Sequence, residues 1–247
     1  MVVSDVHKYV FVELYFTGST SIHKELCELY DGKSILNKHA KYYRFLQIAN
    51  EEQKNYFVFS GIRNPMDMVV TSYLKLMNDP YRKYANAEEW RKAGQRAPSE
   101  KQVKKREKFV RENLTFQQYF KKYYKLPYDN WSSLNHSKFN HIIRFENIQE
   151  DFSELLKKLN IEQKRKLPHR NKTEGKKNFE DYYTSDIRRK AIFIFGPFMQ
   201  KWGYTFPEDW NVKKIDSLSL ILFQLSAAPR KFFWRCRISI NKLISYK

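Results

Sequence analysis

The sequence has 247 residues, enough for one large domain or two small ones whose core needs no disulfide or metal support. Apolar residues make up 42% of the chain and aromatic residues 17%, which excludes disorder throughout. Lys and Arg number 46 against 27 Asp and Glu, so the formal charge is +19 and an anionic partner is expected. Nucleic acid, acidic lipid, anionic glycan and nucleotide phosphates all fit that charge.

The two cysteines, Cys27 and Cys236, are too few for a disulfide framework and have no metal-ligand spacing with the six His. They predict a reducing compartment and no structural metal. The first residues lack the basic and apolar stretches of a signal peptide, and no run of about 18 apolar residues occurs. We therefore expect a cytoplasmic protein, soluble or peripheral on the inner face of a membrane.

Two successive strand–turn–helix patterns occupy the first third of the chain. The apolar run 9–12 is closed by the polar turn 17–21, and apolar residues at helical spacing follow over 22–30. The apolar run 56–59 leads through a turn into a helix in which Pro65 suits the first turn. Two such units predict a parallel sheet.

Two later patterns extend the same architecture. A third strand is predicted at 141–145, followed by an amphipathic helix at 148–159. A further helix over 187–198 has Thr184 or Ser185 available as its N-cap. The predicted fold is therefore a three-layer, P-loop-like α/β domain over residues 1–210 with a central parallel sheet.

Two basic segments differ from the rest. The first, 91–125, holds 12 Lys/Arg against three acidic residues and predicts a mostly helical insertion at about 80–130, with a solvated charged helix pair as the alternative. The second lies in a separate C-terminal segment, 211–247. Its residues 230–247 carry six Lys/Arg and no acid among aromatic and aliphatic residues, which suits an anionic membrane surface. A packed C-terminal helix is the alternative there.

The turn after the first strand has the composition of an anion site. Hydroxyl side chains and backbone N–H groups would be presented there at the start of a helix. It is not a Walker A loop, which needs a second glycine and a lysine directly before Ser/Thr, and this argues against a P-loop kinase. An ordinary helix cap is the alternative. The residues concerned are Thr17, Gly18, Ser19, Thr20 and Ser21.

The second turn adds a phosphate-binding pattern. Arg63 stands at a strand end, and Thr71 follows two helical turns later. A bidentate guanidinium with one further hydroxyl donor suits a phosphate monoester.

These two motifs, about 45 residues apart, resemble those of sulfotransferases that use 3′-phosphoadenosine-5′-phosphosulfate (PAPS), within the group that includes carbohydrate sulfotransferases. In that family Lys-Thr-Gly-(Gly/Ser)-Thr-Ser binds the 5′-phosphosulfate, and Phe16–Ser21 matches it. The family's Arg-(Asn/Asp)-Pro…Ser stretch binds the 3′-phosphate, and Arg63–Pro65 matches it with Thr71 in the serine's place. Ile143–Ile148 and Leu167–Thr173 follow in the family's order, so the resemblance covers about residues 8–207.

The resemblance implies PAPS as co-substrate, no metal, and an acceptor hydroxyl on a saccharide or glycolipid. His39 lies about where several members place the histidine that takes the acceptor proton, and an imidazole pKa near 6.5 suits that task. Glu13, at the end of the first strand, is the rival base. Lys172 lies in a basic loop predicted either to close over the nucleotide's phosphates or to be solvated.

One position departs from the family pattern: Phe16 stands where the family's lysine stabilises charge on the bridging oxygen. Either Lys24, Lys38 or a lysine of the insertion replaces it, or the chain binds the nucleotide without efficient transfer. A nucleotide-binding pseudoenzyme is thus one alternative to a sulfotransferase. A basic nucleic-acid-binding protein is another, although no nucleic-acid recognition motif is visible.

Overall fold

The computed structural model describes residues 1–80, 82–93, 97–129, 139–168 and 177–226. Within them the chain forms two compact units. The first comprises Met1–Asn64, the described part of Asp129–Lys172, and residues 223–226; the second comprises Pro65–Tyr128 and the described part of Thr173–Leu222. The predicted boundary at residue 210 falls inside the second unit, and the predicted membrane-binding stretch 230–247 lies outside the described residues.

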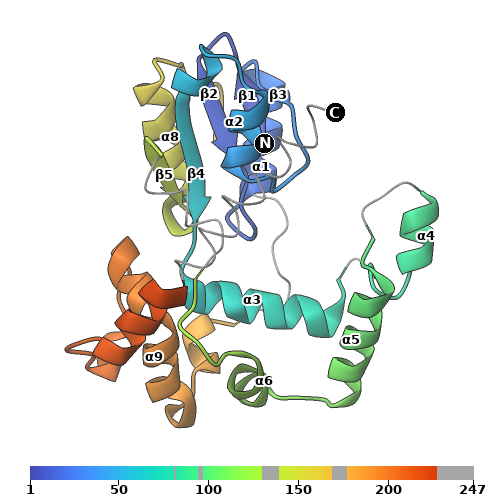
Figure 1. Ribbon diagram of the computed structural model, residues 1–247, viewed down its shortest axis with the longest axis vertical. Helices are drawn as coiled ribbons and strands as arrows, with labels where there is room; N and C mark the ends of the chain where they lie inside the picture. The colour runs from blue at the N-terminus through green and yellow to red at the C-terminus, as the bar shows by residue number, and fades with distance from the viewer. Residues whose placement is uncertain (81, 94–96, 130–138, 169–176, 227–247) are drawn as a thin grey trace. The chain divides into compact units, whose positions relative to one another are not determined.

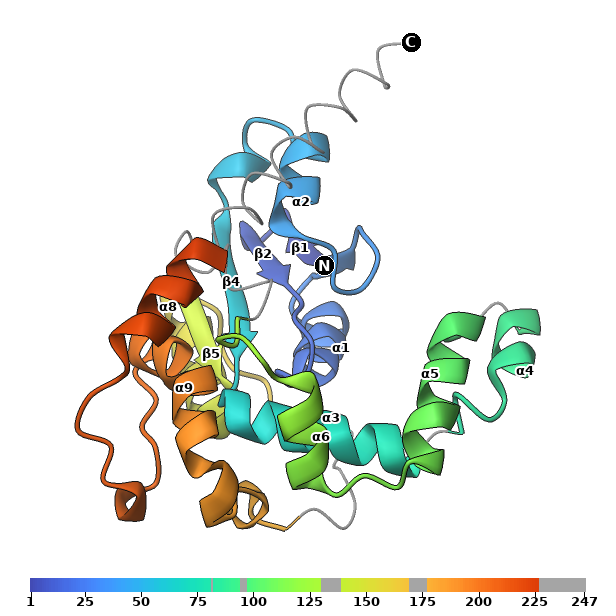
Figure 2. The same cartoon turned by 60° about the horizontal axis from the view of Figure 1, so that its bottom comes forward.

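The first unit contains a five-stranded sheet in the order β3-β1-β2-β4-β5 (Figures 1 and 2). The three predicted strands form its parallel part, since β2 pairs with β4 and β4 pairs with β5 in parallel. Two short strands, β1 and β3, extend the sheet in antiparallel pairing and were not predicted. The strands are β1 (Val2–Ser4), β2 (Tyr9–Val12), β3 (Lys33–Ser34), β4 (Phe57–Ile62) and β5 (His141–Arg144).

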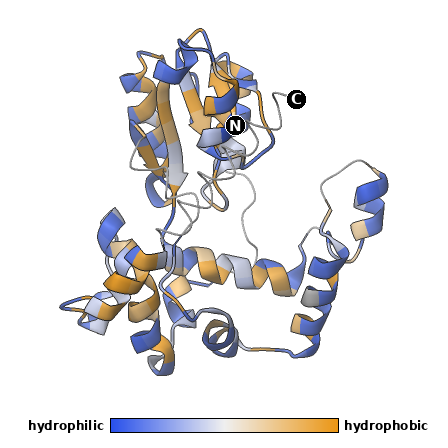
Figure 3. Cartoon of the chain, in the orientation of Figure 1, coloured by the Kyte–Doolittle hydropathy of each residue, from blue (hydrophilic) through white to orange (hydrophobic). Residues whose placement is uncertain are grey.

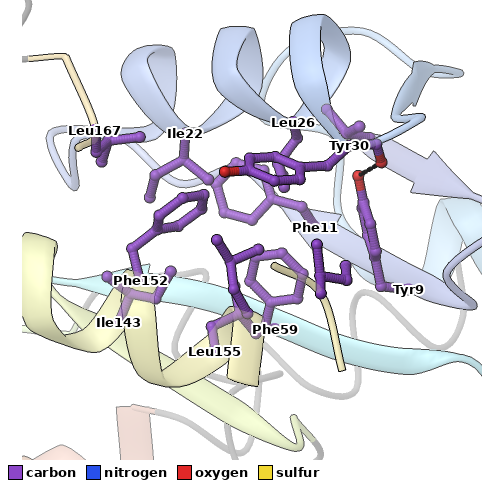
Figure 4. Packing of buried hydrophobic residues seen from close by; sticks show 13 residues of the cluster. Tyr9, Phe11, Ile22, Leu26, Tyr30, Phe59, Ile143, Phe152, Leu155 and Leu167 are labelled. Atoms are coloured by element: carbon purple, nitrogen blue, oxygen red, sulfur yellow. Dashed lines mark hydrogen bonds between the residues drawn. The ribbon is translucent and has the colours of Figure 1, made fainter. Parts of the chain in front are cut away.

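Helices cover both faces of this sheet, because alternate residues of its buried strands point to opposite sides. Tyr9 and Phe11 of β2 pack with α1 (Ser19–Leu29) and α8 (Ile148–Lys158), as Figure 4 shows. Val10 and Val12, on the other side, pack with α2 (Tyr42–Ile48). The predicted three-layer α/β arrangement with a mostly parallel sheet is confirmed.

The second unit is helical around an aromatic core. Its helix α3 begins at Pro65, as predicted, and α9 has Thr184 as its N-cap residue. The basic insertion is helical, as predicted, and Figure 3 shows hydrophilic residues along much of α4 and α5. No helix in the described ranges is long and apolar enough to cross a membrane. The helices are α3 (Pro65–Asn78), α4 (Ala87–Lys92), α5 (Glu100–Arg111), α6 (Phe116–Tyr123) and α9 (Ser185–Trp202).

Candidate functional site

The loop between β2 and α1 has a constrained backbone. Gly18, the N-cap of α1, has a φ of 71°, which is strained for any residue with a Cβ atom, and an added Cβ would also lie 2.4 Å from the terminal Cδ1 of Ile148. Phe16 also has a positive φ, 63°, which is rare for a bulky side chain. Unfavourable backbone conformations of this kind are concentrated at ligand-binding sites, where the surrounding structure holds them in place.

The same loop lies directly against β4. A Cβ atom at Gly61 would lie 2.9 Å from the Thr17 Cβ, so a larger residue in β4 would push the loop away. The Thr17 hydroxyl donates a hydrogen bond to the Leu14 carbonyl at 3.1 Å, which closes the turn. Gly61 was not among the predicted site residues, because its only signal in the sequence is a glycine inside a strand pattern.

The start of α1 is unlike the other helix starts. No side chain caps it, and its first turn contains no acidic residue. Among the described helices of eight or more residues, α1 is the only one with neither feature: α3, α8 and α9 have acids in the first turn, and α5 and α6 have capping boxes. In the described structure the first turn of α1 therefore has neither a side-chain cap at Gly18 nor an acidic residue, although the Ser21 N–H donates to the Gly18 carbonyl at 2.9 Å, and the helix dipole favours an anion there.

Two candidate residues reach this region from the segment that follows β3. Lys38 Nζ donates a hydrogen bond of 2.6 Å to the Thr20 hydroxyl, in the first turn of α1. His39 stacks on Tyr15, with ring centroids 3.8 Å apart, and its Nδ1 lies 3.4 Å from the Glu13 carbonyl oxygen. A carbonyl can only accept, so Nδ1 bears the proton of the neutral ring and Nε2 holds the lone pair. His39 also has a positive φ, 65°.

The carboxylate of Glu13 is enclosed rather than presented to solvent. Its side chain is fully buried, and Oε2 lies 2.5 Å from the main-chain nitrogen of Met1. Oε1 lies 3.1 Å from His23 Nδ1, close enough for an ion pair, but the angle is not that of a hydrogen bond. The side chain of this rival base therefore does not reach the surface.

Arg63 lies next to residues 17–21, the predicted anion loop. Its guanidinium Nη1 donates a hydrogen bond of 3.0 Å to the Phe16 carbonyl, and its Cζ lies 3.9 Å from the centre of the Phe145 ring. The following residue, Asn64, donates its backbone N–H to Glu146 at 2.7 Å. Three motifs separated in sequence therefore meet in the first unit: the loop, Arg63 with Asn64, and Phe145–Asn147.

The remaining predicted residues lie elsewhere. Thr71 is buried on α3 in the second unit, with 1% of its surface exposed. Lys172 lies outside the described residues. A different histidine, His141 at the start of β5, is buried, receives a hydrogen bond from Lys158 and lies 3.2 Å from the Asp151 carbonyl. Burial and the nearby Lys158 charge lower the pKa of its imidazole below 6.5.

The described residues contain no group of three or more His, Cys, Asp or Glu side chains arranged to hold a metal ion. The profile of the sulfotransferase family matches residues 1–195, a range that includes the anion loop, Arg63 and the Phe145–Asn147 motif. No curated protein and no solved structure matches the chain.

Proposed function

Because the chain belongs to the sulfotransferase family, we propose that it transfers the sulfuryl group of PAPS to a hydroxyl group of a saccharide or glycolipid. Family membership supports sulfuryl transfer in general, with a nucleotide sulfate donor and an acceptor. The observation that carries the proposal is the uncapped start of α1, with Lys38 and Arg63 both hydrogen-bonded to its loop. Two cations beside an open helix start suit a donor with several negative charges.

In this proposal the residues Thr17 to Ser21 hold the 5′-phosphosulfate through backbone N–H groups and hydroxyls. Arg63 binds the 3′-phosphate with Thr71, and Lys172 contacts the nucleotide's phosphates. Only the sequence pattern supports these two assignments. The fit is supported by the loop itself, because Gly18 and Gly61 leave room for the backbone where side chains would obstruct it.

His39 is the proposed base. Its Nε2 lone pair takes the proton of the acceptor hydroxyl, the acceptor oxygen bonds to sulfur, and the bond from sulfur to the bridging oxygen breaks with its electron pair left on the phosphate. Glu13 is assigned a positioning role, since its carbonyl fixes the His39 tautomer while its carboxylate is enclosed.

The acceptor class and the location of the reaction rest on sequence. Exposed lysines on α5, Lys101, Lys104 and Lys108, add positive charge that suits an acidic glycan. The stretch 230–247 would hold a cytoplasmic protein on the inner face of an anionic membrane. Co-sedimentation of the full chain with phosphatidylserine vesicles, lost when residues 230–247 are deleted, would support this location; equal binding to neutral vesicles would contradict it.

Binding of adenosine 3′,5′-bisphosphate (PAP) tests the donor site directly. PAP should raise the melting temperature of the full chain by several degrees, because it binds only the folded state. Arg63→Ala should abolish the rise, Arg63→Lys should retain part of it, and Arg44→Ala, which removes an exposed arginine of α2, should leave it unchanged. No shift of the wild-type chain at millimolar PAP would contradict the proposal.

A second candidate is a PAP-binding protein without transfer activity, favoured by Phe16 in place of the family's lysine. It predicts the same thermal shift but no labelled product from PAPS with any hydroxyl acceptor. A wild-type chain that forms such a product excludes it. Steeply salt-dependent DNA binding that PAP does not displace would instead favour the nucleic-acid-binding alternative.

A further inference from the structure

Lys38 makes a contact that its own surroundings do not explain. The side chain is exposed, yet its ammonium is held at 2.6 Å from the hydroxyl of Thr20, in the first turn of α1. A lysine on the surface is best solvated, and ordering its long side chain costs conformational entropy. A neutral hydroxyl is a weak partner for that charge.

The position is also electrostatically unfavourable for a cation by itself. The helix dipole places partial positive charge at a helix start, which repels an ammonium group. No acid in the first turn of α1 offsets that repulsion. An anion bound at the loop would offset this repulsion, because it would attract both the helix start and the Lys38 ammonium.

We infer that Lys38 supplies the charge at the bridging oxygen that the family's lysine would supply from position 16; this rests on the proposed function. An ammonium has three N–H donors, and one is used by Thr20. The other two N–H groups can donate to oxygens of PAPS as the bond from sulfur to the bridging oxygen breaks and that oxygen gains negative charge. Thr20 is then the positioning residue that aims the Lys38 side chain.

The other cations of the first unit fit this role less well. Arg63 has its guanidinium against the Phe16 carbonyl and the Phe145 ring, and it is 8% exposed. Lys24 lies on the exposed face of α1, one turn beyond Thr20 and further from the helix start. Of the two candidate lysines in the first unit, Lys24 and Lys38, it is therefore Lys38 whose ammonium contacts the first turn of α1 in the described structure.

The proposed base and the proposed cation then lie on one short segment. Lys38 and His39 are consecutive, between β3 and α2, and they contact the first turn of α1 and the end of β2 respectively. Transfer would then depend on a segment that follows the anion loop in sequence. In the family's pattern the cation is part of the loop itself.

The test is steady-state transfer of labelled sulfate from PAPS by the full chain carrying Lys38→Met, which keeps an unbranched apolar stem but removes the charge. We expect kcat to fall by about 10²- to 10³-fold, since a preorganised group facing developing charge is lost. KM for PAPS should change much less, because the missing charge develops in the transition state. Lys24→Met, the matched control on α1, should retain wild-type kcat.

A second variant relocates the charge. Phe16→Lys added to Lys38→Met should recover at least tenfold of the lost kcat, because it restores the cation at the family's position. An unchanged kcat in Lys38→Met would overturn the inference while leaving the proposed function standing. Absence of both transfer and a PAP-induced thermal shift in the wild-type chain would instead overturn the proposed function.

Discussion

Hydroxyl residues stand at the starts of α1, α5 and α6, but they cap only α5 and α6. In α5, Ser99 is the N-cap and exchanges hydrogen bonds with Gln102; in α6, Thr115 and Gln118 do the same. In α1 the N-cap is Gly18, and the hydroxyl residues come one position later, inside the helix. A hydroxyl at the N-cap accepts a hydrogen bond from the first turn of the helix, whereas a glycine there offers no side-chain acceptor, as the proposed anion site at α1 requires.

Among the variants that test this comparison, Gly18→Ala should have the largest effect on stability and on PAP binding. The alanine Cβ would have to adopt a positive φ and would overlap Ile148, which together should cost about 2 to 4 kcal/mol of unfolding free energy. Urea denaturation would measure the loss, and the PAP-induced thermal shift should disappear with it.

Gly203→Ala is the matched control, because Gly203 also has a positive φ, 65°, but ends a helix rather than starting one. It should cost about 1 kcal/mol and leave the PAP-induced shift intact. Equal losses of PAP binding in both variants would mean that the loop conformation has no specific role.

Removing the caps should give an intermediate effect on stability alone. Ser99→Ala and Thr115→Ala should each lower the unfolding free energy by about 1 kcal/mol, because each exposed helix start loses its side-chain acceptor. The PAP-induced shift should be unaffected.

Thr20→Val is the converse variant. Its side chain does not cap α1, so stability should change little, while PAP affinity, measured by isothermal titration calorimetry, should fall. A stability loss equal to that of Ser99→Ala would show that Thr20 serves the helix and not a ligand.

The smallest expected effect is on stability at acidic pH, and it involves His141 of the sheet and not the candidate site. His141 has a lowered pKa in the folded chain, so the unfolded chain binds its proton first as the pH falls below 6.5. The unfolding free energy should therefore decrease from pH 7.5 to pH 5.5. His141→Gln should make that loss smaller, as measured by melting temperature at each pH; parallel pH dependences would contradict it.

Local sequence patterns determined most of the fold. Short apolar runs predicted β2, β4 and β5, Pro65 marked the first residue of α3, and helical spacing predicted α1, α8 and α9. They also predicted an anion loop at residues 17–21, because glycine and hydroxyl residues between a strand and a helix are a local signal. Strands β1 and β3, three and two residues long, are too short for periodicity to reveal.

Only the tertiary structure decided which separated side chains meet at that loop. The sequence named Lys24, Lys38 and the insertion lysines equally, and the chain path after β3 brought Lys38 to Thr20 across 18 residues. It likewise named Glu13 and His39 as rival bases, and packing enclosed the Glu13 carboxylate while His39 stacked on Tyr15. Periodicity records which face of an element is apolar, whereas burial and long-range contacts depend on how the elements pack, and so the residues at the site could be proposed from sequence but not ranked.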